Sequence, residues 1–381
     1  MTEPALGSAS AREDRRARIR ELLRQRSDAD GFLPFDRFME VALYADGAGF
    51  YAREESPFGK EGDFYTAAHA SPLFGRTIAE RVRAVVLSDP GGASFRVMEV
   101  GPGDGALGEE IVRGLASEPS VQDRVEYVLV ERSSTLLSRA LERVPAAGRE
   151  VGIPVVAAAG IGADGPFRGV VVANELLDAQ PARRLVWNGE RWEEGGLRWD
   201  GSGFVPATAP LAQPVPPPDL PRPSTPGAVL EVAPMAEAIV REVADHLVSG
   251  LLMVLDYGME ETELLAGHPA GTLAALRRHR AVEDPTSAPG ETDLSVFVNF
   301  TRLRAVAGSS GLVELAVRRQ AEALGVWGFP RLLEDAIRRS ASAEEEVRVR
   351  LAAKNLLFGF DRFYAFEFTP PASAGRRSGF T

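Results

Sequence analysis

The sequence predicts an α/β fold built around a doubly wound sheet, and three observations support this prediction. From residue 95 onward, apolar segments of strand length alternate with segments of helical periodicity, as such a sheet requires. The first apolar segment leads into a glycine-dense turn and then a helix, in the run 97–107. A second apolar segment, 125–131, ends in Glu131, where dinucleotide-type folds hold a ribose.

Composition limits the classes of function that the chain can have. The 381 residues, of which 45% are apolar, predict one large domain with an accessory part, or two domains. The net charge of −11 should repel phosphates, so we expect no nucleic-acid partner. Cysteine is absent, and the four histidines show no ligand spacing, so no metal is expected. Without a signal peptide or an apolar run of membrane-spanning length, we expect a cytoplasmic protein with no membrane contact.

The N-terminal part is predicted to be a helical cap, residues 1–92, followed by the main domain, 93–369, and a tail, 370–381. Apolar spacing predicts helices over 11–26, 34–44 and 71–87, with Pro72 in the first turn of the third. An aromatic, glycine-rich loop that includes residues 58–66 lies between them. Such a loop either binds a ligand or is pinned by its aromatic residues to the domain behind it.

The main domain is predicted element by element. We expect strands at 96–100, 126–131, 153–157, 168–174, 227–232 and 251–257, and helices at 107–116, 134–143 and 234–248. Two insertions interrupt this pattern, at about 183–226 and about 259–303. The first contains a hairpin that turns at Asn188 and Gly189 and continues into a proline-rich excursion. Toward the C-terminus we expect helices at 311–324 and 342–357 and a strand at 360–368.

The glycine turn, Gly101 to Gly105, points to a nucleoside-bearing cofactor. Glycines at 101, 103 and 105 let the backbone come within contact distance of a ligand, although tight packing alone would also explain them. Glu99 argues against a pyrophosphate, which a neighbouring carboxylate would repel. A cationic ligand such as the sulfonium of S-adenosylmethionine would meet no such repulsion.

Polar side chains follow two further strands. Asn174, Glu175 and Asp178 come at or just after the strand 168–174, and Asp256 lies near the end of the strand 251–257. Ligands of open parallel sheets bind at the carboxyl ends of the strands. Helix capping and turn formation are the alternative roles for the two aspartates. Together with Glu131, these acids suit a cationic cofactor and a cationic substrate.

Four further runs, 59–66, 174–181, 256–258 and 289–294, complete a set that resembles the MidA-like family of class I S-adenosylmethionine-dependent methyltransferases. The resemblance extends from about Phe38 to about Leu303. It implies a Rossmann-like, seven-stranded class I methyltransferase sheet with an N-terminal helical cap and two insertions. It also implies S-adenosyl-L-methionine as the cofactor, and a protein arginine as the acceptor by likeness to the mitochondrial member of the family.

The resemblance further implies roles for individual residues. The methionine part of the cofactor would lie along the three glycines, Glu131 would hold the ribose hydroxyls, and the loop with Gly62 would close over the cofactor. The expected cofactor residues are Gly62, Asp63, Phe64, Thr66, Glu99, Gly101, Gly103, Gly105, Leu107, Glu131, Arg132, Asn174 and Glu175. The expected catalytic residues are Asn174, Glu175, Asp178 and Asp256.

The expected chemistry is an in-line displacement at the sulfonium methyl, for which alignment of the reactants supplies much of the acceleration. Glu175 or Asp178 would orient an acceptor nitrogen and take its proton. These acids favour a nitrogen nucleophile or a neutral hydroxyl over a carboxylate. His69 is a further candidate base.

Two departures from the family pattern keep other acceptors open. The Ser-Pro-Glu that commonly follows Gly-Asp-Phe-x-Thr is replaced here by residues 67–69, with His69 in the acidic position, and Val-Asp-Phe reads Val298, Asn299, Phe300. The loss of two acids favours a small-metabolite N- or O-methyltransferase as the alternative to a protein methyltransferase. A non-catalytic, cofactor-binding assembly protein is the third hypothesis, and a homodimer is left open.

Overall fold

The computed structural model describes residues 6–53, 57–59, 66–89, 94–215 and 219–371. The chain forms two compact units, each made of three segments. The first unit holds Met1–Phe64, Leu177–Ala238 and Met259–Ala305, and the second holds Tyr65–Leu176, Ile239–Gly258 and Val306–Thr381. This division runs through both predicted domains, because residues 177–238 and 259–305 of the predicted main domain belong to the first unit. The predicted cap, 1–92, is split, because its last long helix packs in the second unit.

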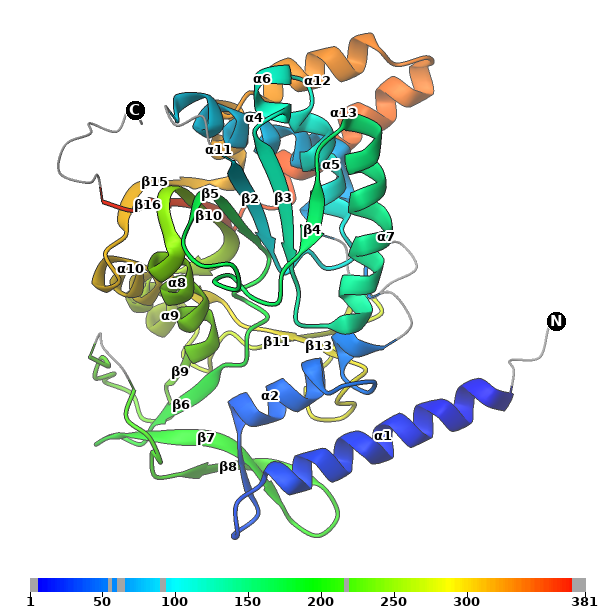
Figure 1. Ribbon diagram of the computed structural model, residues 1–381. Helices are drawn as coiled ribbons and strands as arrows, with labels where there is room; N and C mark the ends of the chain where they lie inside the picture. The colour runs from blue at the N-terminus through cyan, green and yellow to red at the C-terminus, as the bar shows by residue number, and fades with distance from the viewer. Residues whose placement is uncertain (1–5, 54–56, 60–65, 90–93, 216–218, 372–381) are drawn as a thin grey trace. The chain divides into compact units, whose positions relative to one another are not determined.

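The second unit contains the predicted doubly wound sheet. Seven of the eight strands of this sheet lie on one path, in the order β15-β16-β10-β5-β2-β3-β4 (Figure 1). The pairs β3/β4, β2/β3, β2/β5 and β5/β10 are parallel, whereas β16 is antiparallel to both of its neighbours. The carboxyl ends of β2, β3 and β5 therefore lie along one edge of the sheet, with β2 in the middle.

The elements of the second unit are α3 (Ala67–Ala70), α4 (Pro72–Ser88), β2 (Phe95–Val100), α5 (Ala106–Leu115), α6 (Pro119–Gln122), β3 (Val125–Val130), α7 (Ser134–Val151), β4 (Val155–Ala157), β5 (Phe167–Asn174), β15 (Val313–Arg319), α11 (Gln320–Val326), α12 (Phe329–Arg338), α13 (Ala343–Phe358) and β16 (Phe363–Thr369).

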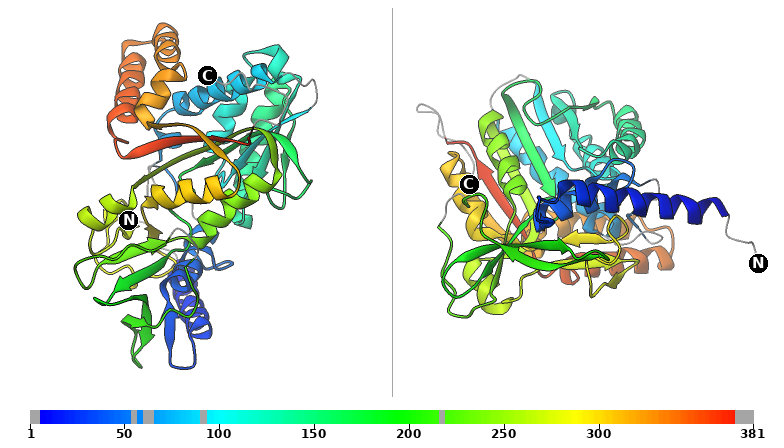
Figure 2. Two further views of the ribbon diagram at one scale, coloured as in Figure 1. Left: turned by 90° about the vertical axis from the view of Figure 1, so that its left-hand side faces the viewer. Right: turned by 90° about the horizontal axis from the view of Figure 1, so that it is seen from below.

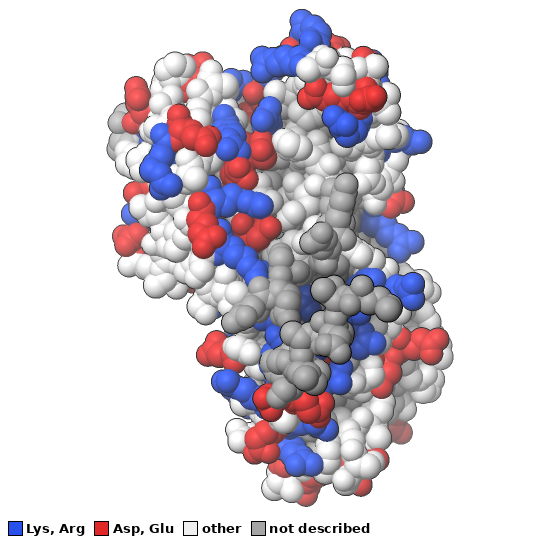
Figure 3. Space-filling model, turned by 90° about the vertical axis from the view of Figure 1, so that its right-hand side faces the viewer, with Lys and Arg blue, Asp and Glu red and all other residues white. Residues whose placement is uncertain are grey.

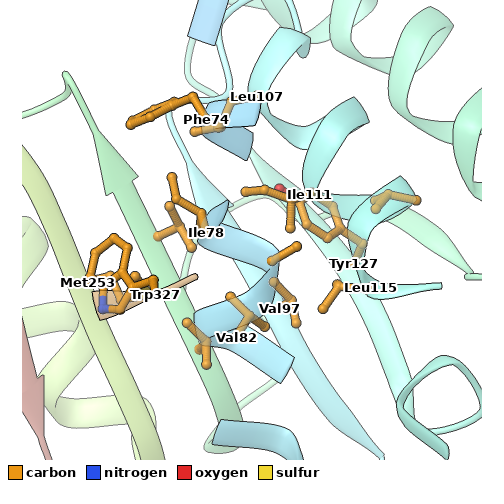
Figure 4. Packing of buried hydrophobic residues seen from close by; sticks show 14 of the residues in the cluster. Phe74, Ile78, Val82, Val97, Leu107, Ile111, Leu115, Tyr127, Met253 and Trp327 are labelled. Carbon is orange, nitrogen blue, oxygen red and sulfur yellow. The ribbon is translucent and has the colours of Figure 1, made fainter. Parts of the chain in front are cut away.

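Helices α4 and α5 pack together against this sheet and fix the position of the glycine turn. Each helix turns an apolar series with a spacing of four residues toward the core, Phe74, Ile78 and Val82 in α4 and Leu107, Ile111 and Leu115 in α5 (Figure 4). Ser71 caps α4, because its hydroxyl accepts the Leu73 N–H, and Pro72 occupies the first turn as predicted. Since α5 starts directly after Gly105, its packing holds the turn in place.

The first unit has two antiparallel sheets. The larger has the order β1-β7-β6-β9, with β8 paired to β7, and the smaller has the order β12-β11-β13. The predicted hairpin is confirmed: β6 and β7 pair antiparallel, and Asn188 Oδ1 accepts the N–H groups of Glu190 and Arg191 at its turn. The strands β6, β7 and β8 of the larger sheet are drawn in green in both views of Figure 2.

The elements of the first unit are α1 (Leu6–Arg26), β1 (Phe32–Pro34), α2 (Phe35–Tyr44), η1 (Phe50–Ala52), β6 (Arg183–Trp187), β7 (Trp192–Trp199), β8 (Phe204–Ala209), β9 (Val229–Val232), α9 (Glu261–Gly267), β11 (Ala274–Arg277), β12 (Arg280–Ala281), β13 (Asp293–Ser295) and β14 (Val298–Asn299). Three elements carry the chain across the boundary between the units: α8 (Pro234–His246), β10 (Leu247–Met259) and α10 (Phe300–Ser309).

Three predictions about elements of the main domain need correction. The strand predicted at 227–232 exists as β9, but it pairs with β6 in the first unit and is not part of the doubly wound sheet. The helix predicted at 311–324 was wrong over residues 313–319, which form the edge strand β15 because β16 offers them a free edge. The helix predicted at 134–143 continues to Val151 despite Pro145 and ends at Gly152, whose φ is 75°.

Two further observations concern the helices and the distribution of surface charge. No helix among the described residues is both long and apolar enough to cross a membrane. On the face drawn in Figure 3, acidic and basic side chains of the described residues are interspersed.

Candidate functional site

The glycine turn follows β2, and three of its positions require glycine. Gly101, Gly103 and Gly105 have φ values of 72°, 57° and 82°, which side chains rarely tolerate. A Cβ on Gly101 would lie 2.6 Å from Leu176 Cδ1, and a Cβ on Gly105 would lie 2.8 Å from Val144 Cγ2. The turn can therefore form only with bare backbone, which leaves its N–H groups close to any ligand at this edge of the sheet.

Glu99 and Leu107, both predicted to contact the cofactor, are buried in the structure. Glu99 is 2% exposed, and its Oε2 accepts a 2.8 Å hydrogen bond from the Tyr127 hydroxyl. A Cβ on Gly108 would lie 2.5 Å from that same oxygen. Burial raises the pKa of Glu99 to about 7, although the bond from Tyr127 opposes the rise. Leu107 is 4% exposed and belongs to the hydrophobic core. We call Glu99, Tyr127 and Gly108 the floor of the turn.

Glu131 lies directly after β3, as predicted, and it contacts the turn. Its carboxylate accepts the Ser133 N–H at 2.8 Å and the Gly103 N–H at 3.3 Å. Burial raises the pKa of Glu131, and these backbone donors act against the rise. Glu131 is half-buried, and its neighbour Arg132 is exposed. The structure thus joins the ends of β2 and β3 through one carboxylate.

The end of β5 carries two unusual features. Asn174 Oδ1 is buried and has no hydrogen-bond partner among the described residues, a condition that normally indicates a missing ligand or water. Glu175 has a φ of 48°, in the left-handed region that non-glycine residues rarely adopt. Backbone strain of this kind is found mainly at functional sites.

Residues 66–69 contact both the end of β5 and the glycine turn that follows β2. The Ala67 N–H donates to Glu175 Oε1 at 3.1 Å. His69 Nδ1 lies 2.7 Å from the Thr66 hydroxyl, and His69 Nε2 lies 3.2 Å from Asp104 Oδ2 in the glycine turn. His69, a candidate base in the sequence, is therefore held in a hydrogen-bonded chain with Thr66, one of the predicted cofactor residues.

Asp104 is a site residue that the sequence prediction missed. Burial alone would raise its pKa, but the hydrogen bond and charge of His69, the charge of Arg143 and the Ala106 N–H together lower it. Its position between two glycines was the available signal, but a turn-forming aspartate gives the same signal. We call Thr66, His69, Asp104, Glu131, Asn174 and Glu175 the rim.

The remaining catalytic candidates are Asp178 and Asp256. Asp178 belongs to the first unit, is 8% exposed and lies close enough to Tyr51 to help raise the pKa of that phenol, after burial and the charge of Asp293. Tyr51 itself donates to Asp293 Oδ1 at 2.9 Å. Asp256 is 1% exposed on β10, in register with Tyr364 of β16. The predicted Gly62, Asp63 and Phe64 lie outside the described residues.

His69 and Asn299 stand where the family pattern has acids, and both make contacts within the protein. His69 contacts Asp104 in the second unit. In the first unit, Asn299 caps α10 by accepting the Arg302 N–H at 3.1 Å, and its amide donates to Glu261 Oε2 at 3.1 Å. Neither position therefore presents a free side chain to a substrate. Among the described residues, no group of three or more His, Asp and Glu side chains could hold a metal ion.

Comparison with known proteins agrees with this geometry. Residues 73–317 match a family described as S-adenosyl-L-methionine-dependent methyltransferases. A solved structure from Burkholderia thailandensis, bound to S-adenosyl-homocysteine, is similar with a TM-score of 0.84 and 28% identity, covering 98% of this chain and 96% of that one.

Curated relatives are more distant. The mitochondrial "Protein arginine methyltransferase NDUFAF7 homolog" of Drosophila melanogaster is 25% identical over 80% of this chain and 74% of its own length. The mouse "Protein arginine methyltransferase NDUFAF7" is 26% identical over 71% of this chain, and the match spans 65% of the mouse protein. The family match covers more than half of the chain, and the fold and the glycine turn agree with it. This chain belongs to the S-adenosyl-L-methionine-dependent methyltransferases, with S-adenosyl-L-methionine as its cofactor.

Proposed function

We propose that this enzyme transfers a methyl group from S-adenosyl-L-methionine to an arginine nitrogen of a protein. The observation that carries the proposal is the match to curated relatives named as protein arginine methyltransferases, over 71–80% of this chain for the fly and mouse proteins. The rim is rich in carboxylates, which supports a cationic acceptor. The alternative, a small-metabolite acceptor, rests on the absence of acids at positions 69 and 299, where His69 and Asn299 make contacts within the protein.

The rim fits the cofactor. Glu131 would accept hydrogen bonds from the ribose hydroxyls, and the backbone of the glycine turn would lie along the methionine part. Asn174 Oδ1, buried and without a partner among the described residues, would accept a hydrogen bond from the cofactor's ammonium group. Contacts from Glu99, Leu107 and Arg132 to the cofactor stay predictions, since two of these side chains lie in the interior and the third is exposed.

The reaction asks little of the protein beyond alignment and removal of one proton. When bound, the cofactor supplies a methyl group on a positively charged sulfur. The acceptor nitrogen forms the new N–C bond as the S–C bond breaks, and the nitrogen then loses a proton. Glu175 is the carboxylate that we assign to orient the nitrogen, because its strained backbone fixes it at the end of β5. Glu175 and Asp178 stay candidates for the proton acceptor, and the catalytic role of Asp256 stays a prediction.

The test is to incubate the full chain with bacterial extract proteins and methyl-labelled S-adenosylmethionine, then hydrolyse the proteins and separate the amino acids. Label in methylarginine supports the proposal. Label only in small molecules would move the function to metabolite methylation. No label from a chain that still binds S-adenosyl-homocysteine would indicate an assembly protein without catalysis.

The cofactor site has its own test, which does not depend on the acceptor. Glu131→Gln should weaken S-adenosyl-homocysteine binding about thirtyfold by calorimetry, since hydrogen bonds to a charged group contribute about 1.5–3 kcal/mol. Glu142→Gln, on the exposed surface of α7, is the matched control. Unchanged affinity in Glu131→Gln would refute the ribose role.

Two further expectations remain proposals. We propose a cytoplasmic location, which fluorescence microscopy of a tagged chain would check. We also propose that a homodimer is compatible with the fold, and sedimentation of the purified chain would decide between monomer and dimer.

A further inference from the structure

His69 lies at the centre of a hydrogen-bonded chain that runs from Thr66 to the glycine turn. Its Nδ1 is 2.7 Å from Thr66 Oγ1, and its Nε2 is 3.2 Å from Asp104 Oδ2. The His69 and Asp104 side chains are 15% and 14% exposed. Because a carboxylate only accepts, Nε2 carries a hydrogen and donates to Asp104. Both ring nitrogens are thus engaged, so His69 is placed to hold another residue and not to collect a proton from a substrate.

Asp104, which contacts His69, also contacts the backbone at the end of the turn. Its Oδ1 accepts the Ala106 N–H at 3.1 Å, at the start of α5, and Arg143 of α7 lies 3.3 Å from Oδ2. The residues on either side of it are Gly103 and Gly105, which resist rotation of the backbone less than any other residue. A turn of this composition needs side-chain contacts to keep one conformation, and Asp104 supplies them.

The same short segment also contacts the end of β5. The Ala67 N–H donates to Glu175 Oε1 at 3.1 Å, and Glu175 follows Asn174 in the chain. Residues 67 and 69, both in the single turn of α3, therefore connect the ends of β2 and β5. The rim residues that we assign to the cofactor lie on these same strand ends.

We propose that His69 is a positioning residue for the cofactor: through Asp104 it fixes the glycine turn relative to the end of β5. This inference rests on the proposed cofactor site. It also explains why histidine can occupy a position that is acidic in the family pattern. A glutamate there would meet the carboxylate of Asp104, whereas a histidine donates to it.

A charge exchange between the two residues tests the proposal. His69→Glu places two carboxylates together, and Asp104→Arg removes the acceptor and faces histidine with a cation. Each single variant should weaken S-adenosyl-homocysteine binding by about tenfold in calorimetry. The double variant His69→Glu/Asp104→Arg restores an ion pair and should recover affinity to within about threefold of wild type. Asp123→Arg, an exposed position in the same unit, controls for the added positive charge.

Steady-state kinetics separate positioning from a general loss of structure. The single variants should raise KM for S-adenosylmethionine with a smaller change in kcat, because the displaced turn affects binding before chemistry. His69→Gln retains a donor of similar size and should lose only about threefold in affinity, which keeps the test usable if His69→Glu fails to fold.

Three results would overturn the inference. They are wild-type affinity in both single variants, no recovery in a folded double variant, and wild-type affinity in Asp104→Arg alone. Glu131→Gln, measured alongside, keeps the two proposals distinct. Weak binding in Glu131→Gln with normal binding in the His69 variants would refute only the role of His69, whereas normal binding in Glu131→Gln would refute the cofactor site.

Discussion

Two acids, Glu99 before the glycine turn and Asp104 within it, have opposite pKa shifts. Glu99, in the floor, is 2% exposed and accepts a hydrogen bond from the neutral Tyr127 hydroxyl, and burial raises its pKa to about 7. Asp104, in the rim, is also largely buried, but His69 and Arg143 outweigh the effect of burial and lower its pKa. The kind of partner, and not burial alone, decides which acid is charged.

This difference changes the argument for a cationic cofactor. The sequence assigned the repulsion of a phosphate to Glu99, but a carboxyl group with a pKa of about 7 is only partly ionised at neutral pH. The fully ionised acid of the turn is Asp104. The sequence argument that Glu99 repels a phosphate is therefore weaker, and the cofactor assignment rests on the family match.

The largest expected effect is on the pH dependence of the free energy of unfolding, when the ionisable carboxyl of Glu99 in the floor is removed. Because the folded-state pKa of Glu99 lies above the ordinary value of 4.5, the folded state retains the proton while the unfolded state loses it. This group therefore lowers the free energy of unfolding as pH rises from 4.5 to about 7, by about 3 kcal/mol in total. In Glu99→Gln this loss should be absent, so the variant should gain stability relative to wild type between pH 5 and pH 8 in urea unfolding. A parallel pH dependence in the two proteins would contradict the raised pKa.

A smaller effect on the free energy of unfolding is expected when a methyl group is added at Gly108 in the floor. In Gly108→Ala the new methyl group would lie 2.5 Å from Glu99 Oε2 and 3.2 Å from the Tyr127 hydroxyl. Overpacking of this kind should lower the free energy of unfolding by about 2 kcal/mol. The matched control is Gly325→Ala in α11, where a Cβ would have nothing within 4 Å and should be neutral or stabilising by up to about 1 kcal/mol. Equal stability of the two variants would show that the floor can relax at no cost.

The smallest expected effect on the free energy of unfolding comes from replacing Arg143, which contacts Asp104 of the rim. Arg143 is 39% exposed and lies 3.3 Å from Asp104 and 3.4 Å from Glu109. Arg143→Gln should cost less than about 1 kcal/mol, and less still at high salt. It should, however, raise the pKa of Asp104 measured by carboxyl NMR titration, because one of the cations that lower it is gone. Arg149→Gln, an exposed position of the same helix, should leave that titration unchanged.

Local patterns in the chain predicted much of the fold correctly. Strands β2, β3 and β5, helices α4 and α5 and the hairpin of β6 and β7 all follow from periodicity, capping and turn residues that act over a few positions. The predictions failed where pairing decides the outcome. An apolar segment such as 229–232 can enter either sheet, and the edge strand β15 exists because a free strand edge lies beside it.

The sequence by itself indicated the class of the protein: a glycine turn between a strand and a helix, followed by an acid after the next strand, predicted a nucleoside-bearing cofactor, and the resemblance of the full set of motifs predicted a methyltransferase. Only the tertiary structure decided which acids of that turn carry charge. A pKa depends on burial and on partners such as Tyr127 and His69, which lie 28 and 35 residues away along the chain from Glu99 and Asp104. Residue types in a motif do not record such partners, because folding alone brings them together.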